Sequence, residues 1–212
     1  MLYNPPHFRE QDRAVLDDQI RRTAFATLVT AGAEGPIVSH LPLLLMPEPA
    51  PDGALIGHVA RANPQWRQSD LDKPALAIFG GPHAYVSPGW YPGKREHGRV
   101  VPTWNYAVVH VTGRLVVLHD ADAVLDIVRR LTDVHEASFA TPWQVSDAPD
   151  EFVRAQLKGI VGLRLEITSV EGKMKLSQNR PVSDREAVVA GLDARGDAAA
   201  SAVSDLMRDR LS

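Results

Sequence analysis

Short apolar runs alternate with turns rich in glycine, proline or polar residues along most of the chain, and this pattern predicts a mostly β protein. Runs with the length and composition of strands occupy residues 24–30, 36–45, 55–61, 75–79, 100–118 and 160–170. Helical spacing of apolar residues predicts helices over 10–23 and 120–131, with a short helical piece over 64–69. The chain is therefore expected to be an α+β protein in which helices flank a sheet.

Turn and cap signals set the expected ends of several elements. Residues 31–35 are expected to form a hairpin loop, and the proline-rich residues 46–52 form a second loop. A helix is expected to begin near 147–150, where Asp can cap and Pro is tolerated in the first turn. Ser183 and Glu186 have capping-box spacing and predict a helix that reaches Gly191, before a final helix.

Two further segments have an unusual pattern. Residues 80–94 are too dense in glycine and proline for a regular helix, and they are expected to form a loop rich in aromatic side chains. Such a loop suits contact with a planar ligand or with a second subunit. The run 100–118 predicts a long hairpin that turns near Gly113, or that bulges there.

A cation follows the apolar run 55–61 at the point where the strand must end. Arg61, Asn63 and Pro64 stand together there, and proline cannot continue the hydrogen-bond ladder. The Arg61 guanidinium matches phosphate oxygens, and Asn63 with free backbone N–H groups of the turn would complete a phosphate site. In the alternative interpretation, Arg61 only ends the strand and pairs with a carboxylate.

Other polar side chains in the predicted strands are candidates for ligand contacts. Ser39 and His40 fall on opposite faces of one strand, so at most one of them points to the interior. Thr103 and Asn105 share one side of another strand, where a buried amide needs partners that a heterocycle could supply. The basic residues 171–180 are either an anion contact or a solvated loop.

Composition and charge narrow the class of protein. The chain has 212 residues, 44% of them hydrophobic, and a net charge of −3, as in an ordinary globular protein without bulk attraction to DNA. Cysteine is absent, which excludes disulfides and a thiol nucleophile and fits a reducing compartment. The N-terminus lacks a leader pattern and no apolar run is long enough to span a bilayer, so a cytoplasmic protein without a membrane partner is expected.

Taken together, the segments resemble the PaiB-like family of FMN-binding negative transcriptional regulators. That family has a split β-barrel related to pyridoxamine-phosphate oxidase. The resemblance covers nearly the whole chain and rests on His7-Phe8, Ser39-His40-Leu41-Pro42, Gly57 to Trp66, Phe79 to Pro88, Val101 to Tyr106, Leu131-Thr132-Asp133, Ile160-Val161-Gly162 and Lys175 to Asn179. It implies one FMN-binding split-barrel domain over 1–212, with an N-terminal helix, inserted helices near 120–158 and C-terminal helices.

The resemblance also implies a homodimer with FMN between two barrels. Arg61 and Asn63 are then expected near the phosphate, with a further cation from Lys94, Lys173 or Lys175, and residues 39–42 near the ring. The expected cofactor-binding residues are Ser39, His40, Leu41, Pro42, His58, Arg61, Asn63, Lys94, Thr103, Trp104, Asn105 and Lys175.

Three functions follow from this resemblance. The first is an FMN-binding dimer that regulates gene expression negatively, although no helix-turn-helix with a basic recognition helix points to direct DNA binding. The second is a flavin-dependent oxidoreductase that holds a small planar substrate near Trp90, Trp104 or His83. The third is a haem-binding or haem-degrading protein with an axial ligand from one of four histidines. Those histidines are His40, His58, His83 and His110.

Overall fold

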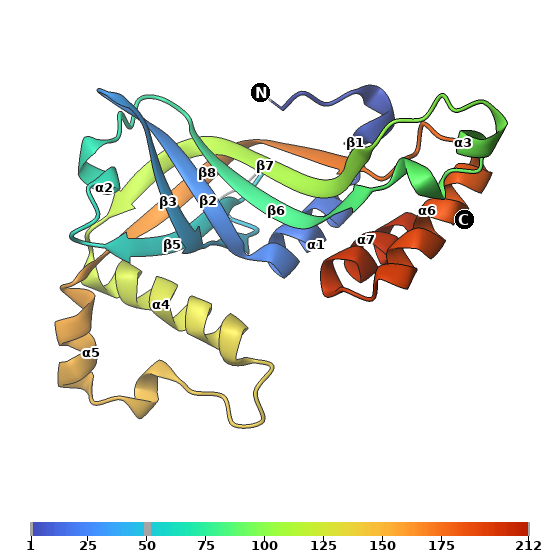
Figure 1. Ribbon diagram of the computed structural model, residues 1–212. Helices are drawn as coiled ribbons and strands as arrows, with labels where there is room; N and C mark the ends of the chain where they lie inside the picture. The colour runs from blue at the N-terminus through green and yellow to red at the C-terminus, as the bar shows by residue number, and fades with distance from the viewer. Residues whose placement is uncertain (1, 49–51, 212) are drawn as a thin grey trace. The chain divides into compact units, whose positions relative to one another are not determined.

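The computed structural model of the chain describes residues 2–48 and 52–211 (Figure 1). Its strands are β1 (Arg9–Glu10), β2 (Phe25–Gly32), β3 (Gly35–Pro42), β4 (Leu44–Met46), β5 (Ala54–Ala60), β6 (Ala75–Val86), β7 (Thr103–Leu118) and β8 (Ile160–Lys175). Its α-helices are α1 (Arg13–Thr23), α2 (Gln65–Gln68), α3 (Gly93–Glu96), α4 (Ala121–Glu136), α5 (Asp150–Leu157), α6 (Val182–Arg195) and α7 (Ala198–Arg208). The predicted mostly β architecture with flanking helices is confirmed.

The strands form a mostly antiparallel sheet with the hydrogen-bonded order β3-β2-β6-β7-β8-β5-β4, and β1 pairs with β8. The chain divides into two compact units. The first unit comprises the residues up to Gln19, Gly80–Val109 and the residues from Glu171 onward, and the second comprises Ile20–Phe79 and His110–Val170. Strands β6, β7 and β8 therefore each contribute residues to both units.

The second unit is organised by two antiparallel pairs. In the hairpin of β2 and β3, Gly32 pairs with Gly35, so the turn is shorter than the predicted 31–35 loop. Strand β5 pairs with β8 along its whole length. Helix α4 lies against β5 (Figure 1) and covers an apolar cluster. That cluster comprises Leu44, Ile56, Ile127 and Leu131.

The first unit packs helices α6 and α7, which lie side by side, against the ends of three strands (Figure 1). Gly196 ends α6 with φ of 69°, a left-handed conformation that glycine adopts without a Cβ clash. The core of this unit includes Val86, Tyr91, Met174, Leu176, Val188, Leu192, Val203 and Met207. No helix of the described chain has the length and apolar character needed to cross a membrane.

Several predicted boundaries are wrong for identifiable reasons. The expected loop over 80–94 begins as strand, because β6 continues to Val86 before short helical turns follow. The expected turn at Gly113 is absent, since β7 is one strand from Thr103 to Leu118. The capping box at Ser183 does not form, because Pro181 is the N-cap residue of α6 and Ser183 already lies in the first turn. Part of the expected 46–52 loop, residues 49–51, lies outside the described residues.

The predicted helix over 10–23 is present from Arg13, and its residues Leu16 and Ile20 are buried as the stripe requires. The helix predicted over 120–131 continues to Glu136. The interpretation of 171–180 as a solvated loop is wrong for its first half, because β8 extends through Lys175 and Lys173 is only 5% exposed.

Candidate functional site

Arg61 lies directly after β5 in the second unit and is exposed. Its Nε donates to the Lys158 carbonyl oxygen at 2.7 Å, and its Nη2 donates to the Ile160 carbonyl oxygen at 2.9 Å. No carboxylate of the described residues pairs with it, so the alternative of an Arg–carboxylate pair is wrong. The guanidinium is thus held by neutral acceptors, which fix its position and leave its charge uncompensated.

The turn after Arg61 is built by Asn63. Its Nδ2 donates to Ser39 Oγ at 2.8 Å, and its Oδ1 accepts the Gln65 backbone N–H at 2.9 Å. The backbone N–H groups of Arg61 and Asn63 donate to carbonyl oxygens of Gly159 and Ala60. The prediction that backbone N–H groups of this turn are free to bind a phosphate is therefore wrong for Arg61, Asn63 and Gln65, whose N–H groups all have acceptors. Among the side-chain donors of this group, the Arg61 Nη1 and the Ser39 hydroxyl hydrogen remain for an anion.

Gln65 is a positioning residue that the sequence analysis missed. Its side chain is fully buried, and its Nε2 lies 3.1 to 3.2 Å from the Leu28 and Ile37 carbonyl oxygens and from Thr30 Oγ1. These contacts join α2 to the β2–β3 hairpin and so hold Asn63 beside Ser39. The sequence offered one signal for this role, a polar residue directly after Asn-Pro at the end of a strand. The role itself could not be predicted, because the partners of Gln65 lie on β2 and β3, 28 to 37 residues earlier in the chain.

The other expected residues of the second unit differ in accessibility. His40 is exposed, and its Nδ1 is 3.0 Å from Thr27 Oγ1, whereas Leu41 is buried. Pro42 is partly exposed at the end of β3. His58 is partly buried and its Nδ1 has no hydrogen-bond partner in the described structure. Burial lowers the pKa of His58, so the neutral imidazole is favoured.

Lys175 and Thr103 meet in the first unit. The Lys175 Nζ donates to Thr103 Oγ1 and, at 2.6 Å, to the Trp104 carbonyl oxygen. Burial lowers the pKa of Lys175, and the nearby charges of Lys173 and Arg180 lower it further. No salt bridge to Lys175 occurs in the described parts of the chain, so this amine also keeps its charge uncompensated.

Three neighbouring aromatic side chains of β6 and β7 form what we call the aromatic strip, namely His83, Tyr85 and Trp104. The Trp104 ring lies 6.1 Å from each of the other two rings, edge-to-face with Tyr85 and tilted against His83. Trp104 is 53% exposed and Tyr85 41% exposed. Large aromatic surfaces left open to solvent in this way are suited to stacking with a planar ligand or partner.

Two further residues that were expected to bind the cofactor, Asn105 and Lys94, belong to the first unit. Asn105 is fully buried, its Nδ2 donates to Ser177 Oγ at 3.0 Å, and Met207 Sδ lies 3.4 Å away. No heterocycle is therefore needed to satisfy this amide. Ser177, which the sequence analysis did not single out as a site residue, has φ of 64°. Lys94 is exposed on the short helix α3.

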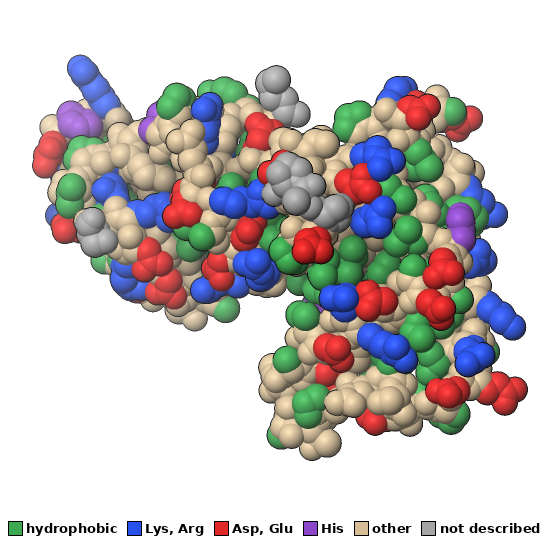
Figure 2. Space-filling view, turned by 180° about the vertical axis from the view of Figure 1, so that it is seen from behind, with side chains coloured by type: hydrophobic (Ala, Val, Ile, Leu, Met, Phe, Trp, Pro, Cys, Tyr) green, Lys and Arg blue, Asp and Glu red, His purple; other side chains and the backbone are tan. Residues whose placement is uncertain are grey.

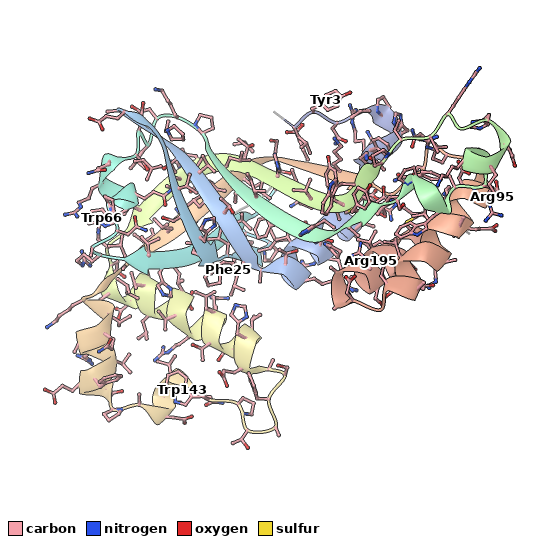
Figure 3. All side chains as sticks on the ribbon, in the orientation of Figure 1. Tyr3, Phe25, Trp66, Arg95, Trp143 and Arg195 are labelled. Carbon is pink, nitrogen blue, oxygen red and sulfur yellow. The ribbon has the colours of Figure 1, made fainter. Side chains whose placement is uncertain are left out.

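The structure thus joins Ser39 to Asn63 in the second unit and Lys175 to Thr103 and Trp104 in the first. Trp66, labelled in Figure 3, lies on α2, and its Nε1 donates to the Arg61 carbonyl oxygen at 3.1 Å.

Comparison with known proteins identifies similar chains. Residues 2–169 match the family described as "putative FMN-binding domain". The chain is 31% identical to the protease synthase and sporulation protein PAI 2 of Bacillus subtilis, over 99% of this chain and 98% of that protein.

Solved structures are also similar in fold. The FAD and haem binding protein from Mycobacterium smegmatis has a TM-score of 0.59 at 17% identity, over 86% of this chain and 80% of that one. The conserved hypothetical protein Rv2991 from Mycobacterium tuberculosis has a TM-score of 0.58 at 12% identity, over 85% of this chain and 94% of that one.

Proposed function

Because the chain belongs to the FMN-binding-domain family, we propose that it binds FMN as a homodimer and acts as a negative regulator of gene expression of the PaiB-like type. The resemblance drawn from its motifs is confirmed, as is the split-barrel fold class. The choice of FMN among flavins, the dimer and the regulatory role are the parts of this proposal that the experiments below test.

The observation that carries the proposal is the uncompensated Arg61 guanidinium. Two carbonyl oxygens hold it in place, and its remaining Nη1 faces no carboxylate of the described residues. A phosphate monoester supplies the charge and the acceptor oxygens that this group lacks. Ser39, held by Asn63, has one hydroxyl hydrogen to add.

The aromatic strip supports the same proposal by its chemistry. An isoalloxazine ring offers a flat face for stacking, and the Trp104 indole is exposed, while the backbone carbonyl oxygen of the same residue accepts a hydrogen bond from the Lys175 amine. When bound, FMN would supply the redox chemistry of its ring, and the protein residues would fix its position and local charge.

The exposed strip also favours a second candidate, a flavin-dependent oxidoreductase that acts on a small planar substrate. An enzyme needs an open face on which substrate can lie, and His83, Tyr85 and Trp104 provide one. Purified protein that is yellow and bleaches on addition of a nicotinamide donor would favour this candidate. Protein that retains its colour under the same conditions would favour the regulator.

Direct contact with DNA has little electrostatic support. The net charge is −3, and on the face shown in Figure 2 acidic and basic side chains are interspersed without a continuous basic stripe among the described residues. We therefore propose that regulation is indirect. Tight, salt-sensitive binding to promoter DNA in a gel-shift titration would contradict this part of the proposal.

The test of cofactor choice compares FMN, FAD and riboflavin, because riboflavin lacks the phosphate. The full chain should bind FMN more tightly than riboflavin. Replacing Arg61 by Ala should weaken FMN binding by roughly 1.5–3 kcal/mol, the range for hydrogen bonds to charged groups, and leave riboflavin binding unchanged.

Arg67→Ala is the matched control, since Arg67 is an exposed arginine of the same region that packs over the Trp66 ring. It should bind FMN like the unmodified chain. Equal affinity of the Arg61→Ala variant and the unmodified chain for FMN would refute the phosphate assignment. Sedimentation should give the mass of two chains, and a monomer that binds FMN would refute the dimer.

A further inference from the structure

A cavity of about 420 Å³ lies in the second unit, and none of the expected cofactor-binding residues lines it. It is bounded by the end of α1, by β4 with the residue before it, and by the last turns of α4. Its volume falls within the roughly 300–1,000 Å³ of small-molecule sites. Six of its nine lining residues are apolar, so its body suits an apolar group.

The apolar wall is built into the fold. Leu43 and Leu44 are 3% and 8% exposed, respectively; Leu44 begins β4, and Leu43 connects β3 to it. Ala24 joins α1 to this wall: its N–H donates to the Ile20 carbonyl oxygen at 2.8 Å, and its own carbonyl oxygen accepts the Leu43 N–H at 2.9 Å. Ala24 has φ of 47°, a conformation that costs energy for a residue with a Cβ and persists only where its surroundings hold it. On the other side Val134 is 56% exposed, an open apolar surface that a ligand would cover.

Two charged side chains of opposite sign line the same cavity without a partner. The side chains of Arg21 and Asp133 form no ion pair or hydrogen bond within the described residues, either with one another or with another group. The third charged lining residue, Arg130, is already paired with Asp126 at 2.6 Å. The carboxylate four residues before Arg21 is also engaged, because Asp17 pairs with Arg13 at 2.7 Å.

We propose that this cavity binds an apolar amino acid. Its carboxylate would accept hydrogen bonds from the Arg21 guanidinium, its ammonium group would donate to Asp133, and its side chain would lie against the apolar wall and Val134. A ligand with only one charge would leave either Arg21 or Asp133 unpaired, whereas a zwitterion satisfies both. This proposal does not rest on flavin binding, since no cavity residue belongs to the cofactor set.

The test is calorimetric titration of the full chain with phenylalanine, phenylalaninamide and N-acetylphenylalanine. The amide lacks the carboxylate charge, and the acetyl compound lacks the ammonium charge. Phenylalanine should bind about tenfold more tightly than either analogue, which corresponds to ~1.4 kcal/mol.

The variants Arg21→Gln and Asp133→Asn should each remove one of these preferences. Arg21→Gln should bind phenylalanine no better than phenylalaninamide, and Asp133→Asn should bind it no better than N-acetylphenylalanine. Arg129→Gln is the matched control, because Arg129 is exposed on α4 and does not line the cavity; it should retain both preferences. All three substitutions replace exposed side chains, and unchanged thermal unfolding would show that the fold is intact. The proposal is overturned if phenylalanine does not bind, if both analogues bind as tightly as phenylalanine, or if the control loses the preferences with the others.

Discussion

Gly113 gives the sharpest test of the packing between β7 and β8. A Cβ placed on Gly113 would overlap the Glu166 carbonyl oxygen, and it would lie 2.8 Å from the Glu166 carbonyl carbon and 3.1 Å from Leu165 Cγ. The first two atoms belong to the backbone of β8 and cannot rotate away, so the two strands must separate. Overpacking of this kind costs about 1–3 kcal/mol, and we expect Gly113→Ala to destabilise the protein by that amount.

Gly80→Ala is the control, because a Cβ there meets no atom within 4 Å. The added methyl group should stabilise the protein by about 0.4–1 kcal/mol, since it restricts the unfolded chain without straining the folded one. Urea unfolding of both variants should therefore place their free energies of unfolding ~1.4–4 kcal/mol apart, with similar slopes. If Gly113→Ala unfolds at the same urea concentration as the unmodified protein, the inference that β7 and β8 leave no room for a Cβ at this position is refuted.

Three further substitutions separate structural from binding roles. Asn105→Ala should lower the free energy of unfolding by about 1–3 kcal/mol, because it leaves the buried Ser177 hydroxyl without its partner; denaturant titration checks this. Trp104→Leu should weaken FMN binding by about 0.5–1.5 kcal/mol through lost ring contact, while thermal unfolding stays unchanged because Trp104 is exposed. Burial lowers the pKa of His58 from 6.5, so the unfolded chain takes up the proton first and stability should fall as pH drops below 6.5. His58→Gln should reduce that pH dependence, and equal slopes for both proteins would contradict the role of His58.

Local pattern was sufficient for most elements of the fold. The helical stripe of Leu16 and Ile20 and the apolar run of β5 have their expected structure because their periodicity records which face is buried. The strand through Gly80 and Pro82 was not predictable in this way. Pairing of β6 with β2 ends at Ile78 in the described chain, which leaves that edge of β6 open where the proline lies.

The candidate site was predictable in residue type but not in hydrogen bonding. An arginine after a strand, followed by Asn-Pro, indicated a cation at a turn. Its acceptors are the carbonyl oxygens of Lys158 and Ile160, which are 97 and 99 residues further along the chain. They reach Arg61 because β5 pairs with the start of β8, and no local pattern states that pairing.

The cations of the two units share a physical feature that favours anion binding. Lys173 is buried, donates to the Tyr3 carbonyl oxygen at 2.8 Å, and has its ammonium 5.0 Å from the Tyr3 ring centroid. Lys175 and Arg61 are likewise held by hydroxyl or carbonyl oxygens. For the buried Lys173 and the partly buried Lys175, neutral acceptors and aromatic faces offset the cost of removing a cation from water without cancelling its charge. A carboxylate partner would cancel much of that field, so we expect each of these three residues to attract an anion more strongly than a cation in an ordinary salt bridge would.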